Sequence, residues 1–161
     1  MGDGFEKKTL FLPQLLMSAD AAKAAFDVIR DSVGGSGEAN GEKVIIATVH
    51  GDIHDIGKNI VKVLMENYGY RVIDLGKDVP VETVVAAAKE HGAKVVGLSA
   101  LMTTTVAAME ETIIALRKEV DCKVVVGGAV LTEEYAEKIG ADCFAPNAVS
   151  AVNYVNKVFG K

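Results

Sequence analysis

From residue 43 onward, short apolar runs rich in β-branched residues alternate with longer amphipathic stretches. Runs that are apolar throughout are typical of strands buried on both faces of a sheet. Strands that alternate with helices indicate βαβ units and a parallel sheet covered by helices on both faces. We expect strands at 44–49, 70–75, 95–99, 123–126 and 143–145, and helices at 57–68, 80–91, 104–119, 132–139 and 149–159.

Five parallel strands joined by right-handed helical crossovers favour the flavodoxin-like order 2-1-3-4-5. In this α/β, Rossmann-like fold the strand order reverses direction between the first and third strands. Ligands bind at the carboxyl ends of those two strands. The loops that begin at His50 and Ser99 follow these two strands. We therefore predict that the functional site lies at these two loops.

A different pattern precedes the predicted sheet. Apolar residues recur at helical spacing between Leu12 and Val33, which predicts an amphipathic helix with Pro13 in its first turn. Residues 34–41 contain four glycines and no apolar periodicity, as flexible linkers do. The predicted organisation is a helical segment at 1–33, a linker at 34–42 and an α/β domain at 43–161.

Composition excludes several classes of function. Among 161 residues, 17 are Lys or Arg and 22 are Asp or Glu, and the net charge of −5 disfavours nucleic acid as a partner. No apolar run is long enough to cross a membrane, and the N-terminus lacks a secretory signal, so we expect a cytoplasmic protein. Cys122 and Cys143 form no C-x-x-C pair, which argues against a disulfide framework or a zinc knuckle.

The loop after the first predicted strand contains D-x-H-x-x-G, as Asp52, His54 and Gly57. A neutral imidazole is a good ligand for a transition metal, and its second ring nitrogen needs an acceptor that fixes its orientation. Asp52 is close enough in sequence to be that acceptor, and Gly57 would let the backbone approach a large ligand. The motif therefore predicts a ligand-binding histidine in the loop that the topology also marks.

The residues of this loop also fit other kinds of site. His54 could be a surface histidine, or it could join His50, Asp52 and Asp55 in a small zinc or iron site. A phosphorylation receiver domain requires an aspartate at the end of the third strand, where this chain has Ser99. A flavodoxin requires a hydroxyl-rich phosphate loop after the first strand, which this chain lacks.

Three separate blocks resemble the cobalamin-binding domain of corrinoid methyltransferases, most closely that of cobalamin-dependent methionine synthase. They are the D-x-H-x-x-G motif, residues 96–105 and residues 126–129. In that family the histidine of the motif replaces the cofactor's own benzimidazole as the lower ligand of cobalt. The resemblance implies the flavodoxin-like fold and bound cobalamin, as methylcobalamin or a related corrinoid.

The resemblance also implies roles for single residues. His54 would bind cobalt, and Asp52 and Thr105 would form a hydrogen-bonded relay behind it. The methionine synthase pattern has Ser at the position of Thr105, so the hydroxyl is kept. The residues expected to contact the cofactor are Gly51, Asp52, Ile53, His54, Asp55, Ile56, Gly57, Ser99, Leu101, Thr103, Thr105, Gly127, Gly128 and Ala129.

By the same resemblance, Ser99 and Thr103 would line the nucleotide tail of the cofactor, and Gly127 and Gly128 would leave room for it. Taken alone, each block also fits a plain structural role, as a helix cap or as a strand-to-helix turn. Their joint position after the first, third and fourth strands favours a shared site.

Residues 11–21 resemble the last helix of the cap that covers the upper cobalt face in methyl-carrying corrinoid proteins. Radical isomerases share D-x-H-x-x-G but lack this cap. The family's cap has four helices, so residues 1–33 would form a truncated helical cap segment. Because the apolar stripe of the predicted helix must be buried somewhere, we expect self-association, a partner chain or a longer parent polypeptide.

The resemblance implies a methyl carrier of the methionine synthase type, active in methionine biosynthesis, that transfers methyl groups from methyltetrahydrofolate to homocysteine. Its expected partners are methyl-donor and methyl-acceptor methyltransferase domains or proteins, and the chain is not expected to be catalytic alone. The alternative is a free-standing corrinoid protein of a methanol, methylamine or O-demethylase methyltransferase system. The small subunit of an adenosylcobalamin-dependent mutase and a cobalamin-responsive regulator are less favoured.

Overall fold

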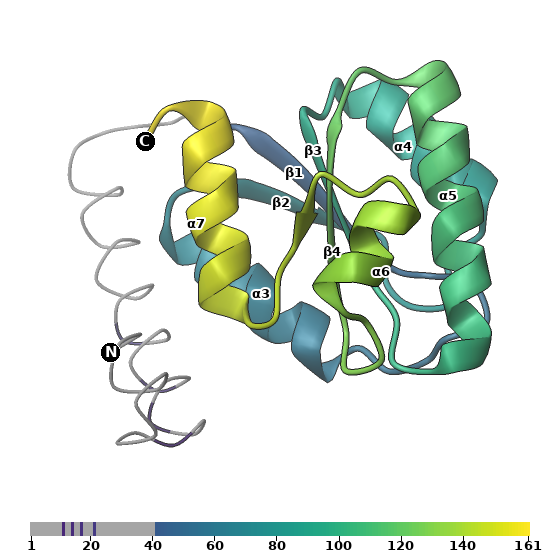
Figure 1. The fold of residues 1–161 in the computed structure, drawn as a ribbon. Helices are drawn as coiled ribbons and strands as arrows, with labels where there is room; N and C mark the ends of the chain where they lie inside the picture. Colours follow the sequence, from purple (N-terminus) through teal and green to yellow (C-terminus); the bar gives the residue numbers. More distant parts are fainter. Residues whose placement is uncertain (1–10, 12–13, 15–16, 18–20, 22–40) are drawn as a thin grey trace.

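The computed structural model describes residues 11, 14, 17, 21 and 41–161. The predicted N-terminal helix, the cap resemblance and self-association through that helix therefore fall largely outside the described residues, as does most of the linker. Figure 1 shows the remaining chain as one sheet flanked by helices. The elements are β1 (Lys43–Thr48), α3 (Ile56–Asn67), β2 (Arg71–Asp74), α4 (Val81–His91), β3 (Val95–Ser99), the 3-10 turn η1 (Thr103–Thr105), α5 (Val106–Glu119), β4 (Lys123–Gly127), α6 (Glu133–Lys138), β5 (Cys143–Phe144) and α7 (Ala148–Phe159).

The five strands form one parallel sheet in the order β2-β1-β3-β4-β5. This confirms the predicted flavodoxin-like α/β fold. The register pairs Thr48 with Ser99, and Ser99 with Gly127. The last residues of the three central strands therefore lie in one row, and the loops that follow them leave the sheet side by side.

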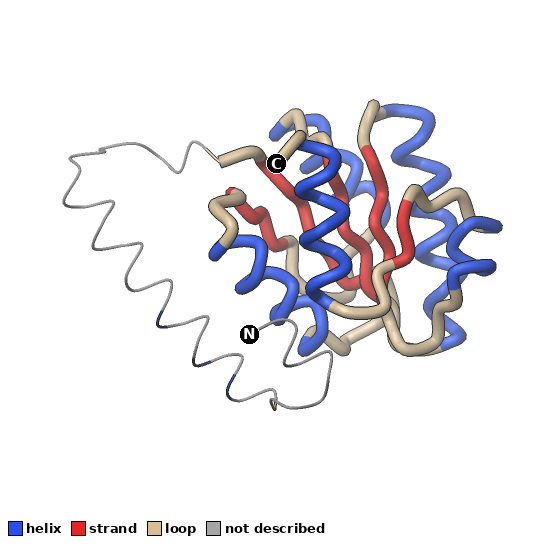
Figure 2. Tube along the Cα trace, turned by 60° about the vertical axis from the view of Figure 1, so that its left-hand side comes forward, coloured by secondary structure: helices blue, strands red, loops and turns tan. Residues whose placement is uncertain are grey.

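Helices cover both faces of the sheet (Figure 2). Within β1, Val44 and Ile46 contribute to the apolar cluster that α3 and α7 cover, whereas Ile45 and Ala47 contribute to the cluster under α4, α5 and α6. Such alternation follows from the two-residue period of a strand. It explains why the sequence of β1 is apolar throughout, since both of its faces are buried.

The ends of the elements differ from the predictions by a few residues at most. The sequence predicts that the third helix begins at residue 104, but α5 begins at Val106 because residues 103–105 form a separate 3-10 turn. The backbone amide of Thr105 donates to the carbonyl of Met102, at 3.1 Å, and closes this turn. An i to i+3 hydrogen bond of this kind is that of a 3-10 helix, so the α-helix starts later than predicted.

Candidate functional site

The β1–α3 loop turns sharply after the sheet edge and directs one side chain inward. Gly51 has a left-handed backbone, with φ of +81°, and the amide of Asp52 donates to the carbonyl of Val49 at 3.1 Å. This turn places the Asp52 side chain under the loop, where the residue is 0% exposed. The hydroxyl of Thr48, at the end of β1, donates to the carbonyl of His54 at 3.3 Å.

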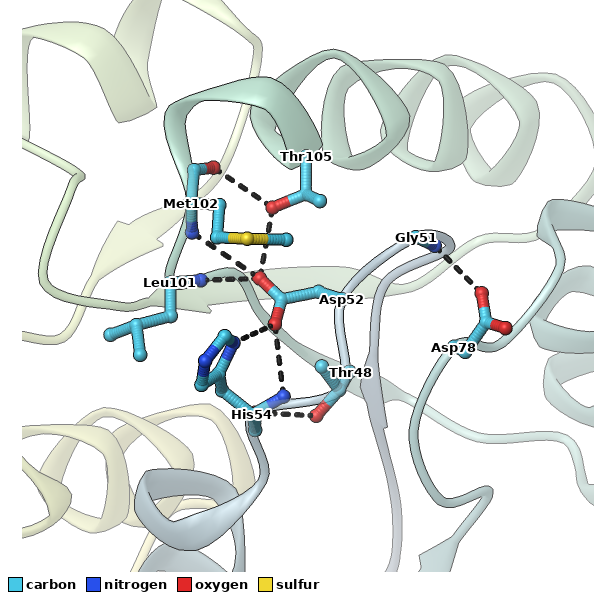
Figure 3. Close-up of polar contacts among 8 residues, drawn as sticks. All are labelled: Thr48, Gly51, Asp52, His54, Asp78, Leu101, Met102 and Thr105. Carbon is cyan, nitrogen blue, oxygen red and sulfur yellow. Dashed lines mark hydrogen bonds and ion pairs between the residues drawn. The ribbon is translucent and has the colours of Figure 1, made fainter.

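The Asp52 carboxylate joins the two loops that the topology marks (Figure 3). Its Oδ1 accepts from the ring Nδ1 of His54, at 2.8 Å, and from the backbone amide of the same residue, at 3.0 Å. Its Oδ2 accepts from the β3–α5 segment, namely from the amides of Leu101, at 2.6 Å, and Met102, at 3.3 Å, and from the Thr105 hydroxyl, at 2.9 Å.

These contacts fix the ionisation of Asp52. Burial alone would raise the pKa of its carboxyl group, but the amides of Leu101 and His54, the imidazole and the Thr105 hydroxyl outweigh it. The net effect holds the pKa of Asp52 well below its ordinary value. Asp52 is therefore a carboxylate at neutral pH, and it can only accept hydrogen bonds.

An accepting carboxylate also determines the tautomer of His54. The proton of the neutral imidazole must reside on Nδ1, which faces Asp52, so Nε2 carries a free lone pair. The His54 side chain is 46% exposed, whereas Asp52 behind it is fully buried. This arrangement, in which a buried carboxylate orients a partly exposed imidazole, suits a histidine that binds a transition metal through Nε2.

The Thr105 hydroxyl has one proton and two acceptors within reach. It lies 2.9 Å from Asp52 Oδ2 and 2.8 Å from the Met102 carbonyl oxygen. A charged oxygen is the stronger acceptor, so the proton is donated to Asp52 while that residue is ionised. His54, Asp52 and Thr105 thus form one hydrogen-bonded chain, in the order in which the resemblance arranges them.

A cavity of about 560 Å³ opens beside His54, between the carboxyl ends of the central strands and the helices α3 and α7. Its wall is mostly apolar, which suits a large organic ligand. Ten residues of the predicted cofactor site line it: Ile53, His54, Asp55, Ile56, Gly57, Ser99, Leu101, Gly127, Gly128 and Ala129.

Four residues of the predicted site lie elsewhere. Asp52 and Thr105 are buried behind His54, and Gly51 is exposed in the turn that precedes them. Thr103 is exposed at the start of the 3-10 turn and is not among the residues that line the cavity. A role for Thr103 at the nucleotide tail stays a prediction.

The two glycines after β4 are required by the fold itself. A Cβ atom on Gly128 would lie 1.7 Å from the carbonyl oxygen of Ala100, and one on Gly127 would lie 3.2 Å from that of Ala145. The backbone of Gly128 also has φ of +141°, which L-residues rarely adopt. The lack of side chains here thus serves backbone packing, in addition to any room it leaves for a ligand.

Sequence reasoning missed some of the cavity wall. Lys58, in the first turn of α3, lines the cavity although its side chain is only 3% exposed, and its Nζ lies 2.5 Å from Asp74 Oδ1 at the end of β2. Pro146 and Asn147, in the loop after β5, line it as well. Ligands bind at the carboxyl ends of parallel strands, and all five strands end at the same edge. The loop after β5 could therefore have been predicted as part of the site.

The predicted alternative of a small zinc or iron site finds no support in the part of the chain that the structure describes, where no three His, Cys, Asp or Glu side chains gather to hold a metal. His50 instead faces Asp78, at 2.8 Å from its Nδ1. Across the same described residues, no helix has the length and apolarity needed to span a bilayer.

Comparison with known proteins identifies the family. Residues 42–153 match the B12 binding domain. Dimethylamine corrinoid protein 3 of Methanosarcina mazei is 43% identical over 156 residues, which cover 94% of this chain and 93% of that protein. A cobalamin-binding protein from Desulfitobacterium hafniense DCB-2 has a structure with a TM-score of 0.86 and 35% identity, covering 97% of this chain and 75% of that one.

A third similar protein belongs to an assembly. In the methanol:cobalamin methyltransferase complex MtaBC of Methanosarcina barkeri, one chain gives a TM-score of 0.84 and 30% identity, covering 98% of this chain and 61% of that one. The orienting carboxylate, the free Nε2 of His54 and the apolar cavity beside it all suit a corrinoid. With its D-x-H-x-x-G loop, its sheet order and these similarities, the chain belongs to the family of B12-binding domains.

Proposed function

We propose that this protein is a free-standing corrinoid protein of a methylamine or methanol type of methyltransferase system, and that it carries methyl groups between two methyltransferases. The observation that carries the proposal is the free Nε2 of His54, held by buried Asp52 at the rim of an apolar cavity. A bound corrinoid would supply the cobalt atom that accepts and gives up the methyl group.

His54 would be the lower ligand of cobalt through Nε2, and the cavity would hold the nucleotide tail of the cofactor. Ile53, Ile56 and Leu101 are exposed, line the same cavity as the imidazole and offer an apolar surface to a flat macrocycle. The exposed areas of these side chains do not stabilise the protein without its cofactor, since apolar surface contributes only when it leaves water.

Asp52 and Thr105 would control how strongly His54 binds. A carboxylate at Nδ1 keeps the proton on that atom and makes Nε2 a better electron donor. With or without a bound metal, His54 would keep the hydrogen bond from Nδ1 to Asp52, which holds the ring in place. The Thr105 hydroxyl stabilises the negative charge of Asp52 in both situations.

The comparisons favour the alternative interpretation of the sequence over the methionine synthase type. The similar proteins are a dimethylamine corrinoid protein, matched over nearly its whole length, and a chain of a methanol:cobalamin methyltransferase complex. They lend no support to a part in methionine biosynthesis. The partners that we propose are a methyltransferase that takes methyl groups from a methylamine or methanol, and a second one that removes them from the corrinoid.

The cobalt ligand is tested by electron paramagnetic resonance of the protein loaded with cobalamin and reduced to cobalt(II). The benzimidazole of the cofactor is labelled with ¹⁵N, so that its splitting pattern differs from that of a protein nitrogen. We expect ¹⁴N splitting in the wild type and in His50→Ala, whose imidazole faces Asp78 instead, and its loss in His54→Ala. Splitting from ¹⁵N in the wild type would overturn the proposal.

The type of system is tested separately by methyl loading. The reduced protein is mixed with purified methyltransferases specific for dimethylamine, methanol or methyltetrahydrofolate, and formation of the methylated cofactor is followed by its visible spectrum. Loading from an amine or from methanol supports the proposal. Loading from methyltetrahydrofolate alone would overturn the proposal and favour the methionine synthase type.

A further inference from the structure

The β2–α4 loop runs beside the loop that carries His54. The amide of Thr48 donates to the carbonyl of Gly76, at 3.0 Å, and the amide of Val79 donates to the carbonyl of Thr48, at 3.1 Å. A further parallel bridge pairs Val49 with Val79. The chain around Asp78 is thus held against the end of β1, where the His54 loop begins.

Asp78 contacts this loop at three consecutive residues. Its Oδ1 accepts from the amide of Gly51, at 2.7 Å, and from Nδ1 of His50, at 2.8 Å. Its own amide donates to the carbonyl of Asp52, at 2.9 Å. Asp78 therefore contacts the backbone on both sides of the Asp52 Cα atom, and Figure 3 shows its contact with Gly51.

The backbone of Asp78 is unusual. Its φ is +53°, and within the described part of the chain no other residue except glycine has a positive φ. Aspartate tolerates this left-handed region better than most residues, but glycine would adopt it more readily. A residue kept in such a conformation near a functional loop suggests that its side chain is needed there.

The side chain of Asp78 does not need its protein partners in order to be hydrogen-bonded. Its side chain is 51% exposed and that of His50 is 64% exposed, so water could replace both of their hydrogen bonds. Asp52, in contrast, is inaccessible, and its two ends are held from different sides: the carboxylate by the β3–α5 segment and the backbone by Asp78. Both contacts therefore act on the residue whose Oδ1 accepts from the imidazole of His54.

We propose that Asp78 is a positioning residue for His54: through Gly51 and the backbone of Asp52, it fixes the direction in which the imidazole is presented to its ligand. The proposal rests on the proposed function in one respect, that the ligand is the cobalt of a corrinoid. The effect on the loop itself is a property of the chain without its cofactor, and it is tested independently.

Two substitutions separate the hydrogen bonds from the backbone conformation. Asp78→Asn keeps an acceptor oxygen on a residue that tolerates a positive φ. Asp78→Gly suits the positive φ better but removes the acceptor. His50→Gln is the third variant, because it removes the imidazole that pairs with Asp78 and leaves the Gly51 contact intact.

The first measurement is amide hydrogen exchange of the full chain without cofactor, read at Gly51 and His54. In Asp78→Gly we expect exchange about three- to tenfold faster at both amides, the size that the loss of one hydrogen bond supports, and wild-type rates in Asp78→Asn. Faster exchange at Gly51 alone, with His54 unchanged, would mean that Asp78 only caps its own turn, and would overturn the proposal. Equally fast exchange in Asp78→Gly and Asp78→Asn would overturn the proposal too.

The second measurement is the fraction of cobalt(II) that shows ¹⁴N splitting from His54, in protein loaded with ¹⁵N-labelled cobalamin. We expect a smaller fraction in Asp78→Gly and the wild-type fraction in Asp78→Asn and His50→Gln. A wild-type fraction in Asp78→Gly would overturn the positioning role. If the wild type shows no such splitting, the proposed function fails, and hydrogen exchange at His54 still decides whether Asp78 orients this loop.

Discussion

Asp52 and His54 are joined by two hydrogen bonds to a single oxygen atom. Oδ1 of Asp52 accepts one from the ring Nδ1 of His54, at 2.8 Å, and one from the backbone amide of His54, at 3.0 Å. One acceptor thereby fixes both the side chain and the main chain of the histidine. The tautomer follows from the charge of Asp52, and the direction of Nε2 follows from the geometry of the pair. The testable consequences concern this pair, its supports and the cavity beside it.

Replacement of Asp52 by Asn should loosen His54 and destabilise the fold. An amide group would have to turn its NH₂ toward either the Leu101 and Met102 amides or the imidazole, so at least one buried donor would lose its acceptor. The expected loss is about 1–3 kcal/mol in the free energy of unfolding. Urea unfolding measures it, and Asp121→Asn at an exposed position should leave stability unchanged.

Removal of the Thr105 hydroxyl should affect His54 through Asp52. Thr105→Val keeps the shape of the side chain but deletes one donor to the carboxylate, at an expected loss of about 1 kcal/mol. Amide hydrogen exchange at His54 should become faster, because a less firmly held carboxylate is a weaker acceptor for that amide. Thr105→Ser should behave as the wild type, and unchanged exchange at His54 in Thr105→Val would contradict the chain of hydrogen bonds.

The Lys58–Asp74 pair should be important for stability. The Lys58 side chain is 3% exposed and its Nζ lies 2.5 Å from Asp74. Lys58→Met would therefore leave a largely buried carboxylate with Lys62 and the Gly76 amide as its remaining partners. We expect a loss of about 3 kcal/mol in the free energy of unfolding. Lys62→Met, which removes the weaker contact at 3.4 Å, should change it by less than about 1 kcal/mol.

Acid should destabilise the protein through carboxylates with lowered pKa values. Burial raises the pKa of Asp142, but the Val124 amide, Arg117 and Lys123 outweigh it and lower the pKa overall. A group whose pKa is lower in the folded state contributes its full stabilisation above its unfolded pKa of about 3.9, and loses it as the pH falls toward the folded value.

Urea unfolding at a series of pH values between neutrality and pH 3 should therefore show a steep decline only below about pH 4. Asp142→Asn should be less stable at neutral pH and should lose less on acidification. An equal slope in the two proteins would contradict this role of Asp142.

Gly57 and Gly128 form a matched pair for substitution by Ala. At Gly128 the new Cβ would collide with the backbone of Ala100, and we expect a loss of about 3 kcal/mol or more. At Gly57, in the first turn of α3, it would meet nothing within 4 Å, so Gly57→Ala should be as stable as the wild type or more stable by about 0.5–1 kcal/mol. Because Gly57 lines the cavity, this variant should bind cobalamin more weakly, which equilibrium binding measures.

The sheet could be predicted from the sequence because its strands are apolar on both faces and alternate with helices. The rule for parallel sheets then located the loops, and it brought Asp52 and Thr105 together although they are 53 residues apart in the chain. The predicted relay thus has the expected geometry, whereas its role in binding cobalt stays a prediction.

Other features depend on contacts that have no local pattern. Lys58 resembles an ordinary surface lysine of an amphipathic helix, and only the position of β2 reveals Asp74 as its buried partner. The left-handed backbone of Asp78 has no signal either, since glycine is the residue that usually marks such a position. The resemblance explains Gly128 only by the room it leaves for the cofactor. The nearest obstacle to a side chain at this position is instead the backbone of Ala100.

The cavity is confined to one side of the sheet, where α3 and α7 supply its helical wall and α4, α5 and α6 supply none. Among the described residues, the two helical layers on this sheet therefore differ, because one borders the cavity and the other packs on the apolar cluster of the opposite face. A ligand in the cavity would contact the layer of α3 and α7 and would leave the packing of α4, α5 and α6 unchanged. One small domain thus combines a helical layer that can contact a ligand with a second layer that only packs against the sheet.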